Sequence, residues 1–270
     1  MDLRPIGVFD SGLGGLTGLA ELRRLMPEES IVYFGDTGRL PYGEKTLEQL
    51  RVMAVQNLNL MGSRGVKAIL VACGTLSSNT PELLDAFPIP TTGVLRPSVR
   101  AMAQTPGDGA LGVIATAATI RSGAFARALE AACPGREIVP VPCPKLVPLI
   151  ETGHTDPEDP LLLEAVEEYT APLQHASAVL LGCTHYGIVA ETLARFLPAE
   201  TALVSASACG AAAVHDLLEQ KDLRGGTGEE KYLVSGDPEG FAQSASLLLG
   251  RRIDGRVERI PVMPIEEKPL

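Results

Sequence analysis

The chain has 270 residues and a formal net charge of -10, with 45% hydrophobic and 21% charged residues. This length predicts about two domains, and the acidic balance argues against a nucleic-acid partner, which would require clustered Lys and Arg. No run approaches the ~20 apolar residues of a membrane span and no signal-peptide pattern opens the chain, so we expect a cytoplasmic protein without a membrane partner.

Short apolar runs recur with little alternation, which is typical of strands buried on both faces of a parallel sheet. In chain order the expected strands are Ile6–Phe9, Ile31–Phe34, Ala68–Ala72, Thr91–Leu95, Leu111–Ala115, Ile138–Val141, Val179–Leu181, Ala202–Val204 and a final strand at Lys231–Val234. Amphipathic stretches between them predict helices at Leu16–Leu25, Thr46–Ser63, Gly123–Ala132, Leu161–Leu173 and Ala208–Leu218. This alternation predicts an α/β fold with right-handed crossovers.

The elements divide into two similar α/β domains, each with a mainly parallel sheet flanked by helices. We expect residues 1–95 plus about 207–270 to form the first domain and residues 96–206 the second. A flexible surface loop is expected at Gly225–Gly228, before the final strand. Ligands of such sheets bind at the carboxyl ends of the strands, so the functional residues should follow directly after the strands.

Two cysteines occupy matching places in the two halves, because Cys73 and Cys183 each follow a buried strand. A free cysteine is often a small buried hydrophobe. A strand end followed by hydroxyl groups and a helix N-terminus instead predicts a thiol pKa lowered toward neutral for Cys73. His185, two residues after Cys183, can exchange protons with that thiol. We interpret the two cysteines as a functional pair.

The other cysteines have different surroundings. Cys133 and Cys143 lie beside prolines and are interpreted as structural, whereas Cys209 begins an Ala-rich helix and has no assigned role. Five cysteines without a close CxxC pair favour a reducing compartment over a disulfide framework. Because no second pair of ligands at zinc spacing accompanies them, we expect no metal and no other cofactor.

Polar residues follow other strand ends. Asp10 and Ser11 lead into a glycine-rich turn, where they either cap the next helix or approach a ligand. Pro41-Tyr42-Gly43 forms a turn after the second strand and presents backbone N–H groups. Glu151 places a charged carboxylate at the end of an otherwise apolar helical turn. It is either a solvent-facing helix end or a proton partner of the site.

Five motifs occur in order between Ile6 and about Gly187. They are Gly7-Val8-Phe9-Asp10-Ser11-Gly12, Pro41-Tyr42-Gly43, Ala72-Cys73-Gly74-Thr75, Gly112-Val113-Ile114-Ala115-Thr116 and Gly182-Cys183-Thr184-His185-Tyr186. With them the chain resembles the glutamate racemases of the aspartate/glutamate racemase superfamily. One residue departs from that pattern, because the first cysteine motif usually reads Ala-Cys-Asn-Thr and Gly74 replaces the Asn here.

The resemblance implies two α/β domains related by a pseudo-twofold axis, with the substrate in the cleft between them. It implies cofactor-independent interconversion of L- and D-glutamate, which supplies D-glutamate for peptidoglycan synthesis. The implied catalytic residues are Cys73 and Cys183 as a two-base pair, with Asp10, His185 and Glu151 as their partners. The implied substrate-binding residues are Asp10, Ser11, Pro41, Tyr42, Gly43, Gly74, Thr75, Thr116, Thr119, Thr184 and His185.

Several alternatives stay open at this point. Gly74 leaves an aspartate or hydantoin racemase of the same superfamily as the nearest rival. A Cys–His hydrolase that uses Cys183 and His185 is a second alternative, and a non-catalytic amino-acid-binding module is a third. The sequence does not fix the oligomeric state, and a homodimer is compatible with it.

Overall fold

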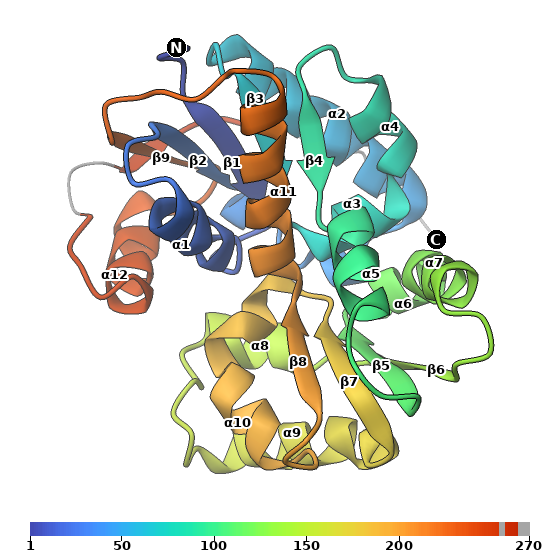
Figure 1. Ribbon diagram of the computed structural model, residues 1–270. Coiled ribbons are helices and arrows are strands. Elements are labelled where there is room, and N and C mark those ends of the chain that lie inside the picture. Colours follow the sequence, from blue (N-terminus) through green and yellow to red (C-terminus); the bar gives the residue numbers. More distant parts are fainter. Residues whose placement is uncertain (254–256, 264–270) are drawn as a thin grey trace.

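The computed structural model describes residues 1–253 and 257–263, and it contains two parallel sheets, one above the other in Figure 1. We call the part around the larger sheet the first domain and the part around the smaller sheet the second domain. In spatial order, the larger sheet comprises β10 (Val257–Arg259), β9 (Glu230–Val234), β2 (Ile31–Gly35), β1 (Ile6–Asp10), β3 (Ala68–Val71) and β4 (Thr91–Gly93). The smaller sheet comprises β6 (Ile138–Pro142), β5 (Ala110–Ala115), β7 (Ala176–Leu181) and β8 (Ala202–Ser205).

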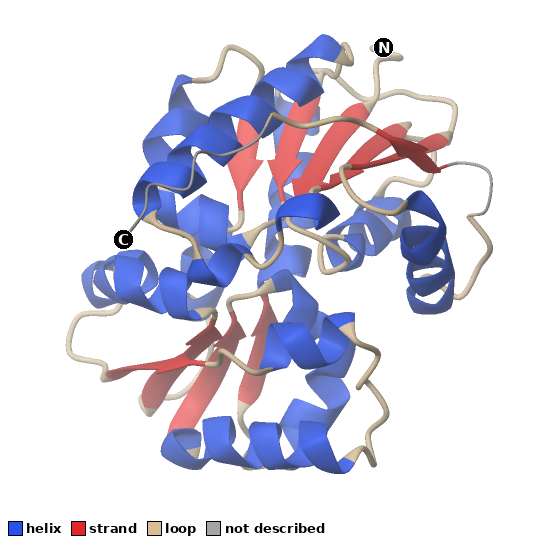
Figure 2. Ribbon diagram, turned by 180° about the vertical axis from the view of Figure 1, so that it is seen from behind, coloured by secondary structure: helices blue, strands red, loops and turns tan. Residues whose placement is uncertain are grey.

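Helices cover both faces of each sheet, as Figure 2 shows, which is why the strands read as nearly continuous apolar runs. In the first domain these are α1 (Leu16–Leu25), α2 (Leu47–Ser63), α3 (Gly74–Asn79), α4 (Pro81–Ala86), α11 (Ala206–Gln220) and α12 (Pro238–Leu248). In the second they are α5 (Leu95–Ala103), α6 (Ala117–Ser122), α7 (Ala124–Ala132), α8 (Leu146–Glu151), α9 (Pro160–Thr170) and α10 (Ala190–Arg195). Short 3-10 turns occur at Thr37–Arg39, Tyr42–Glu44, Ala171–Leu173 and Thr184–Val189.

Each sheet separates two apolar cores. In the first domain, α1 packs with α11 on one face, where Leu19 and Val214 are fully buried, and α2 covers the other face with Met53. In the second domain, α9 lies on one face with Val166, and α5 and α7 lie on the other with Leu129. The chain passes into the second domain between β4 and α5, and returns between β8 and α11.

The two sheets repeat one topology. The strand order β2-β1-β3-β4 in the first sheet recurs as β6-β5-β7-β8 in the second, with every neighbouring pair parallel. The predicted similarity of the two halves is thereby confirmed. Strand β3, which precedes Cys73, corresponds to β7, which precedes Cys183. In both sheets the strand order reverses between β1 and β3 and between β5 and β7, and such a switch point is where open α/β sheets bind ligands.

Three details of the sequence prediction are wrong. The strand expected at Thr91–Leu95 ends at Gly93, because Leu95 already begins α5. The strand at Lys231–Val234 is not the last, since β10 pairs beside β9. The loop at Gly225–Gly228 is also anchored rather than free.

A fully buried ion pair anchors that loop. Lys67 Nζ lies 2.5 Å from Glu29 Oε2, and both side chains are completely buried. The ammonium group also donates to the carbonyl oxygen of Gly225, whose N–H donates to Glu29 Oε1 over 2.8 Å. A buried charge requires such partners, and a lone Lys in an apolar run does not reveal where they lie.

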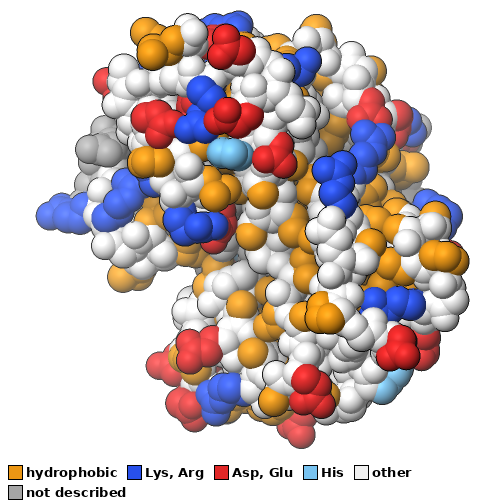
Figure 3. Space-filling model, in the orientation of Figure 1, with side chains coloured by type: hydrophobic (Ala, Val, Ile, Leu, Met, Phe, Trp, Pro, Cys, Tyr) orange, Lys and Arg blue, Asp and Glu red, His pale blue; other side chains and the backbone are white. Residues whose placement is uncertain are grey.

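Charged side chains of both signs are interspersed over the face seen in Figure 3, and the surface is indented between the two domains on the left of that view. Within residues 1–253 and 257–263, no helix is long and apolar enough to cross a membrane.

Candidate active site

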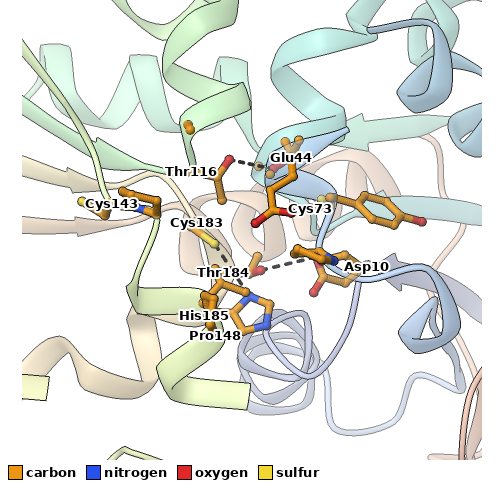
Figure 4. A pocket seen from close by; sticks show the side chains of 18 residues that line it. Asp10, Glu44, Cys73, Thr116, Cys143, Pro148, Cys183, Thr184 and His185 are labelled. Carbon is orange, nitrogen blue, oxygen red and sulfur yellow. Dashed lines mark hydrogen bonds between the residues drawn. The ribbon is translucent and has the colours of Figure 1, made fainter. Parts of the chain in front are cut away.

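A cavity of about 50 Å³ lies between the carboxyl ends of the two sheets. Figure 4 shows Cys73 and Cys183 on two sides of it, one carried by each domain. All of the residues predicted to form the site line this cavity except Glu151 and Thr119. The lining residues are Asp10, Ser11, Pro41, Tyr42, Gly43, Glu44, Cys73, Gly74, Thr75, Thr116, Ala117, Cys143, Pro144, Val147, Pro148, Cys183, Thr184 and His185.

Cys73 lies between the end of β3 and the start of α3, with only 3% of its surface exposed. Burial and the negative charge of Asp10 raise the pKa of this thiol well above its usual value. Backbone hydrogen bonds from Leu76 and Thr75 act in the opposite direction and are outweighed. The expectation of a lowered pKa for Cys73 is therefore wrong, because a thiol so deeply buried loses more through desolvation than it gains from nearby N–H groups.

Cys183 begins a chain of three hydrogen-bonded side chains. Its Sγ lies 3.7 Å from His185 Nδ1, and His185 Nε2 lies 2.5 Å from Glu151 Oε1. Burial by itself lowers the pKa of His185, but hydrogen bonds to Cys183 and Glu151 outweigh it and raise that pKa well above the usual value. Burial correspondingly raises the pKa of Glu151, while the bond from His185 brings the net value below normal. A protonated His185 places positive charge beside Cys183.

Glu151 does not line the cavity itself but is hydrogen-bonded to His185, which does. It also connects the domains, because Leu13 N of the first domain donates to Glu151 Oε1 over 3.0 Å. Gly14 makes room for this arrangement, since a Cβ there would lie 2.3 Å from His185 Nδ1. The glycine-rich turn thus packs against the imidazole, and Glu151 contacts both this turn and His185.

Asp10 is completely buried at the end of β1. Its Oδ2 accepts hydrogen bonds from Gly15 N at 2.9 Å and Gly12 N at 3.3 Å, so its carboxylate orders the turn before α1. Its Oδ1 accepts a bond from Thr184 Oγ1 of the other domain at 3.3 Å (Figure 4). The helix-capping interpretation is wrong, because Gly15 is the N-cap of α1 and no side chain caps that helix. Asp10 instead lines the cavity, and its part in the site stays a prediction.

Three threonine hydroxyls gather on the other side of the cavity. Thr75 Oγ1 and Thr116 Oγ1 lie 2.9 Å apart across the domain boundary, and Thr119 Oγ1 lies 2.9 Å from Thr116 Oγ1. Thr75 and Thr116 line the cavity, whereas Thr119 does not. Thr119 follows Thr116 by about one helical turn, so its hydroxyl contacts that of Thr116, and its substrate contact stays a prediction.

Tyr42 lines the cavity, but its hydroxyl is hydrogen-bonded to buried residues behind the cavity wall. The phenol donates to Asp36 Oδ2 and accepts a bond from Asn57 Nδ2 at 3.1 Å, and all three side chains are buried. Arg39 Nε and Ser235 Oγ, both 2.7 Å from Asp36, complete this network. The loop Pro41-Tyr42-Gly43 is thereby held from behind, and what it presents to the cavity is backbone and ring.

Six of the lining residues were not predicted from the sequence, and two of them, Glu44 and Cys143, carry a titratable side chain. Glu44 follows Gly43 directly, and Figure 4 shows its side chain extending toward the space beside Cys73. Cys143, interpreted as structural, also lines the cavity while its Sγ donates to Val141 O over 3.4 Å. The strand-end rule applied to β6 would have found Cys143.

Among the described residues, no group of three His, Cys, Asp or Glu side chains is arranged to hold a metal ion.

A repeated α/β fold brings one buried thiol from each domain to a shared cavity, and comparison with known proteins assigns a chain with this arrangement to the amino-acid racemases. The family model for Asp/Glu/Hydantoin racemase matches residues 19–214. A glutamate racemase of Thermus thermophilus is 40% identical over 268 residues, covering 97% of each chain. The chain belongs to the Asp/Glu/Hydantoin racemase family.

Solved structures agree with this assignment. A glutamate racemase isoform from Bacillus anthracis is similar over 97% of this chain and 99% of its own, with a TM-score of 0.90 and 29% identity. A glutamate racemase from Francisella tularensis, solved in complex with D-glutamate, covers 96% of this chain and 98% of its own, with a TM-score of 0.87 and 32% identity.

Proposed function

We propose that this protein interconverts L-glutamate and D-glutamate, with Cys73 and Cys183 transferring protons at opposite faces of Cα. The observation that carries the proposal is the equivalence of β3 and β7, which places one cysteine from each domain at the same cavity. The D-glutamate complex of the Francisella tularensis relative supports glutamate as the substrate. We further propose that the reaction takes place in the cytoplasm and supplies D-glutamate for peptidoglycan; the five free cysteines suit a reducing compartment.

In each direction one sulfur acts as a thiolate and removes the α-proton, while the other acts as a thiol and delivers its proton to the opposite face. After turnover the two sulfurs have exchanged roles. General acid–base catalysis contributes about 10²–10⁴-fold, so charge developing on the α-carboxylate also needs stabilisation. We assign this stabilisation to nearby backbone N–H groups and to the hydroxyls of Thr75 and Thr116, which line the cavity.

The two sulfurs have different surroundings. Burial and the negative charge of Asp10 raise the pKa of Cys73, which favours its thiol form, whereas Cys183 lies 3.7 Å from the imidazole of His185. A substrate ammonium group beside Asp10 would offset the carboxylate charge, which lowers the cost of forming a thiolate on Cys73 when this sulfur is the base.

His185 should set the alkaline limit of activity. Because the pKa of His185 is raised, its imidazole stays protonated at neutral pH and loses its proton only as pH rises through that raised value. We therefore expect kcat/KM to fall toward high pH. In Glu151→Gln the neighbouring negative charge is lost, so the fall should begin at lower pH. Profiles of kcat/KM for both proteins test this, and coincident alkaline limbs would contradict the assigned role of Glu151.

The Cys183–His185–Glu151 chain also has the connectivity of a nucleophile–base–orienter triad, so a thiol hydrolase is the second candidate. A hydrolase requires one cysteine, and it gives no role to Cys73. A burst of acylation with an activated ester would favour hydrolysis over racemisation.

Incubation in D₂O with L-glutamate, D-glutamate and both enantiomers of aspartate tests the proposal. We expect optical rotation to decay to zero with either glutamate enantiomer while deuterium enters Cα. Faster racemisation of aspartate would assign the protein to the nearest rival activity, and binding of glutamate without exchange would indicate a binding module.

A further inference from the structure

The two cysteine motifs touch each other through their backbones at Gly74. This residue follows Cys73 and begins α3. A Cβ added to Gly74 would lie 2.1 Å from the carbonyl oxygen of Gly182, 3.2 Å from its carbonyl carbon and 3.6 Å from Cys183 Cα. Any side chain at position 74 would therefore collide with the peptide that carries the other cysteine.

Neither partner in this contact has freedom to move aside within its own domain. The peptide N–H of Gly182 donates to Ile114 O over 2.8 Å, which fixes the end of β7 in its sheet. On the opposite side, Ser77 N donates to Cys73 O over 3.0 Å and closes the first turn of α3. Since the obstacle is a backbone carbonyl and not the end of a flexible side chain, a Cβ at position 74 must be accommodated by separating the two domains.

We propose that Gly74 is a positioning residue that sets the distance between the two sulfurs across the substrate Cα. It lets the strand ends approach about 1 Å closer than any side chain would permit, and a misplacement of that size can lower a rate by about a hundredfold. This inference rests on the proposed racemase function. The related motif has an Asn side chain at this position. Gly74 has no side chain, and the two domains approach each other more closely instead.

Gly74→Ala is the test, with Gly18→Ala as the matched control. Gly18 is a buried glycine of α1 whose added Cβ would meet its neighbours at 3.5 and 3.6 Å, which is ordinary contact. We expect Gly74→Ala to lower kcat for glutamate racemisation by about a hundredfold, while Gly18→Ala retains the wild-type value. Thermal unfolding should show both variants folded, because the collision at position 74 lies between domains.

The isotope distribution in D₂O separates positioning from a general loss of structure. When the second sulfur is too distant to deliver its proton, the first sulfur returns a solvent deuteron to the same face. Gly74→Ala should therefore raise the ratio of deuterium in recovered substrate to deuterium in product, and Gly18→Ala should not. Gly74→Asn, which supplies the amide of the related motif, should behave like Gly74→Ala, because its Cβ meets the carbonyl of Gly182 first.

Two results would overturn the inference while leaving the proposed function intact. One is a wild-type racemisation rate in Gly74→Ala or Gly74→Asn, and the other is a slower rate with an unchanged isotope ratio. A wild-type protein that neither racemises glutamate nor exchanges its α-proton would instead refute the proposed function, and the role of Gly74 with it.

Discussion

Cys73→Ala and Cys183→Ala are each expected to abolish racemisation, with kcat reduced on the order of 10⁴-fold, because inversion needs a proton donor and an acceptor on opposite faces. Neither variant removes more than one buried sulfur atom, so both should fold. Circular dichroism of the glutamate solution measures the rate, and thermal unfolding checks the fold. Cys209→Ala is the control, since Cys209 is a half-buried cysteine of α11 that does not line the cavity.

If either cavity variant racemises glutamate at nearly the wild-type rate, the two-cysteine mechanism is wrong. An equal loss in Cys209→Ala would show that removal of any thiol damages the protein, which would also remove the support for the pair.

Asp10→Asn should give the second largest loss, a fall in kcat/KM of roughly 10²- to 10³-fold, as expected when one partner of a buried charge pair is removed. The amide keeps the size of the side chain but loses the charge that raises the pKa of Cys73 and that we propose faces the substrate ammonium group. The equilibrium constant between enantiomers is unity, so kcat/KM must fall equally from L- and D-glutamate. Steady-state kinetics in both directions measure this.

Asp36→Asn is the matched control, because Asp36 is as deeply buried as Asp10 but lies outside the cavity, behind Tyr42. We expect its effect on kcat/KM to stay within about tenfold. Similar losses in the two variants would mean that Asp10 matters only as a buried structural carboxylate.

The strand ends were predictable from sequence because parallel strands buried on both faces show as short apolar runs. The positions of Cys73, Cys183, Asp10 and Thr116 follow from that rule, since each directly follows its strand or closes it. The repeat of the two halves was visible only as two short motifs. The strand order of the two sheets shows that four strands of the first domain correspond one by one to the four strands of the second.

What the sequence could not show depends on contacts between residues distant in the chain. The pKa of Cys73 depends on how fully the two domains bury it, and burial reverses the expected direction. The hydroxyl of Tyr42 turns toward Asp36 because Asn57 and Ser235 arrive there from other elements. A missing Asn at position 74 was visible, but the carbonyl of Gly182 that faces it was not.

The most direct test of the central claim is α-deuterium exchange by the two single-cysteine variants in D₂O. Each variant retains one sulfur next to one face of Cα. Cys73→Ala and Cys183→Ala should therefore exchange the α-proton of one glutamate enantiomer each, without inversion, and the two variants should select opposite enantiomers. Exchange of the same enantiomer by both variants, or of both enantiomers by either one, would contradict a mechanism with one cysteine on each face.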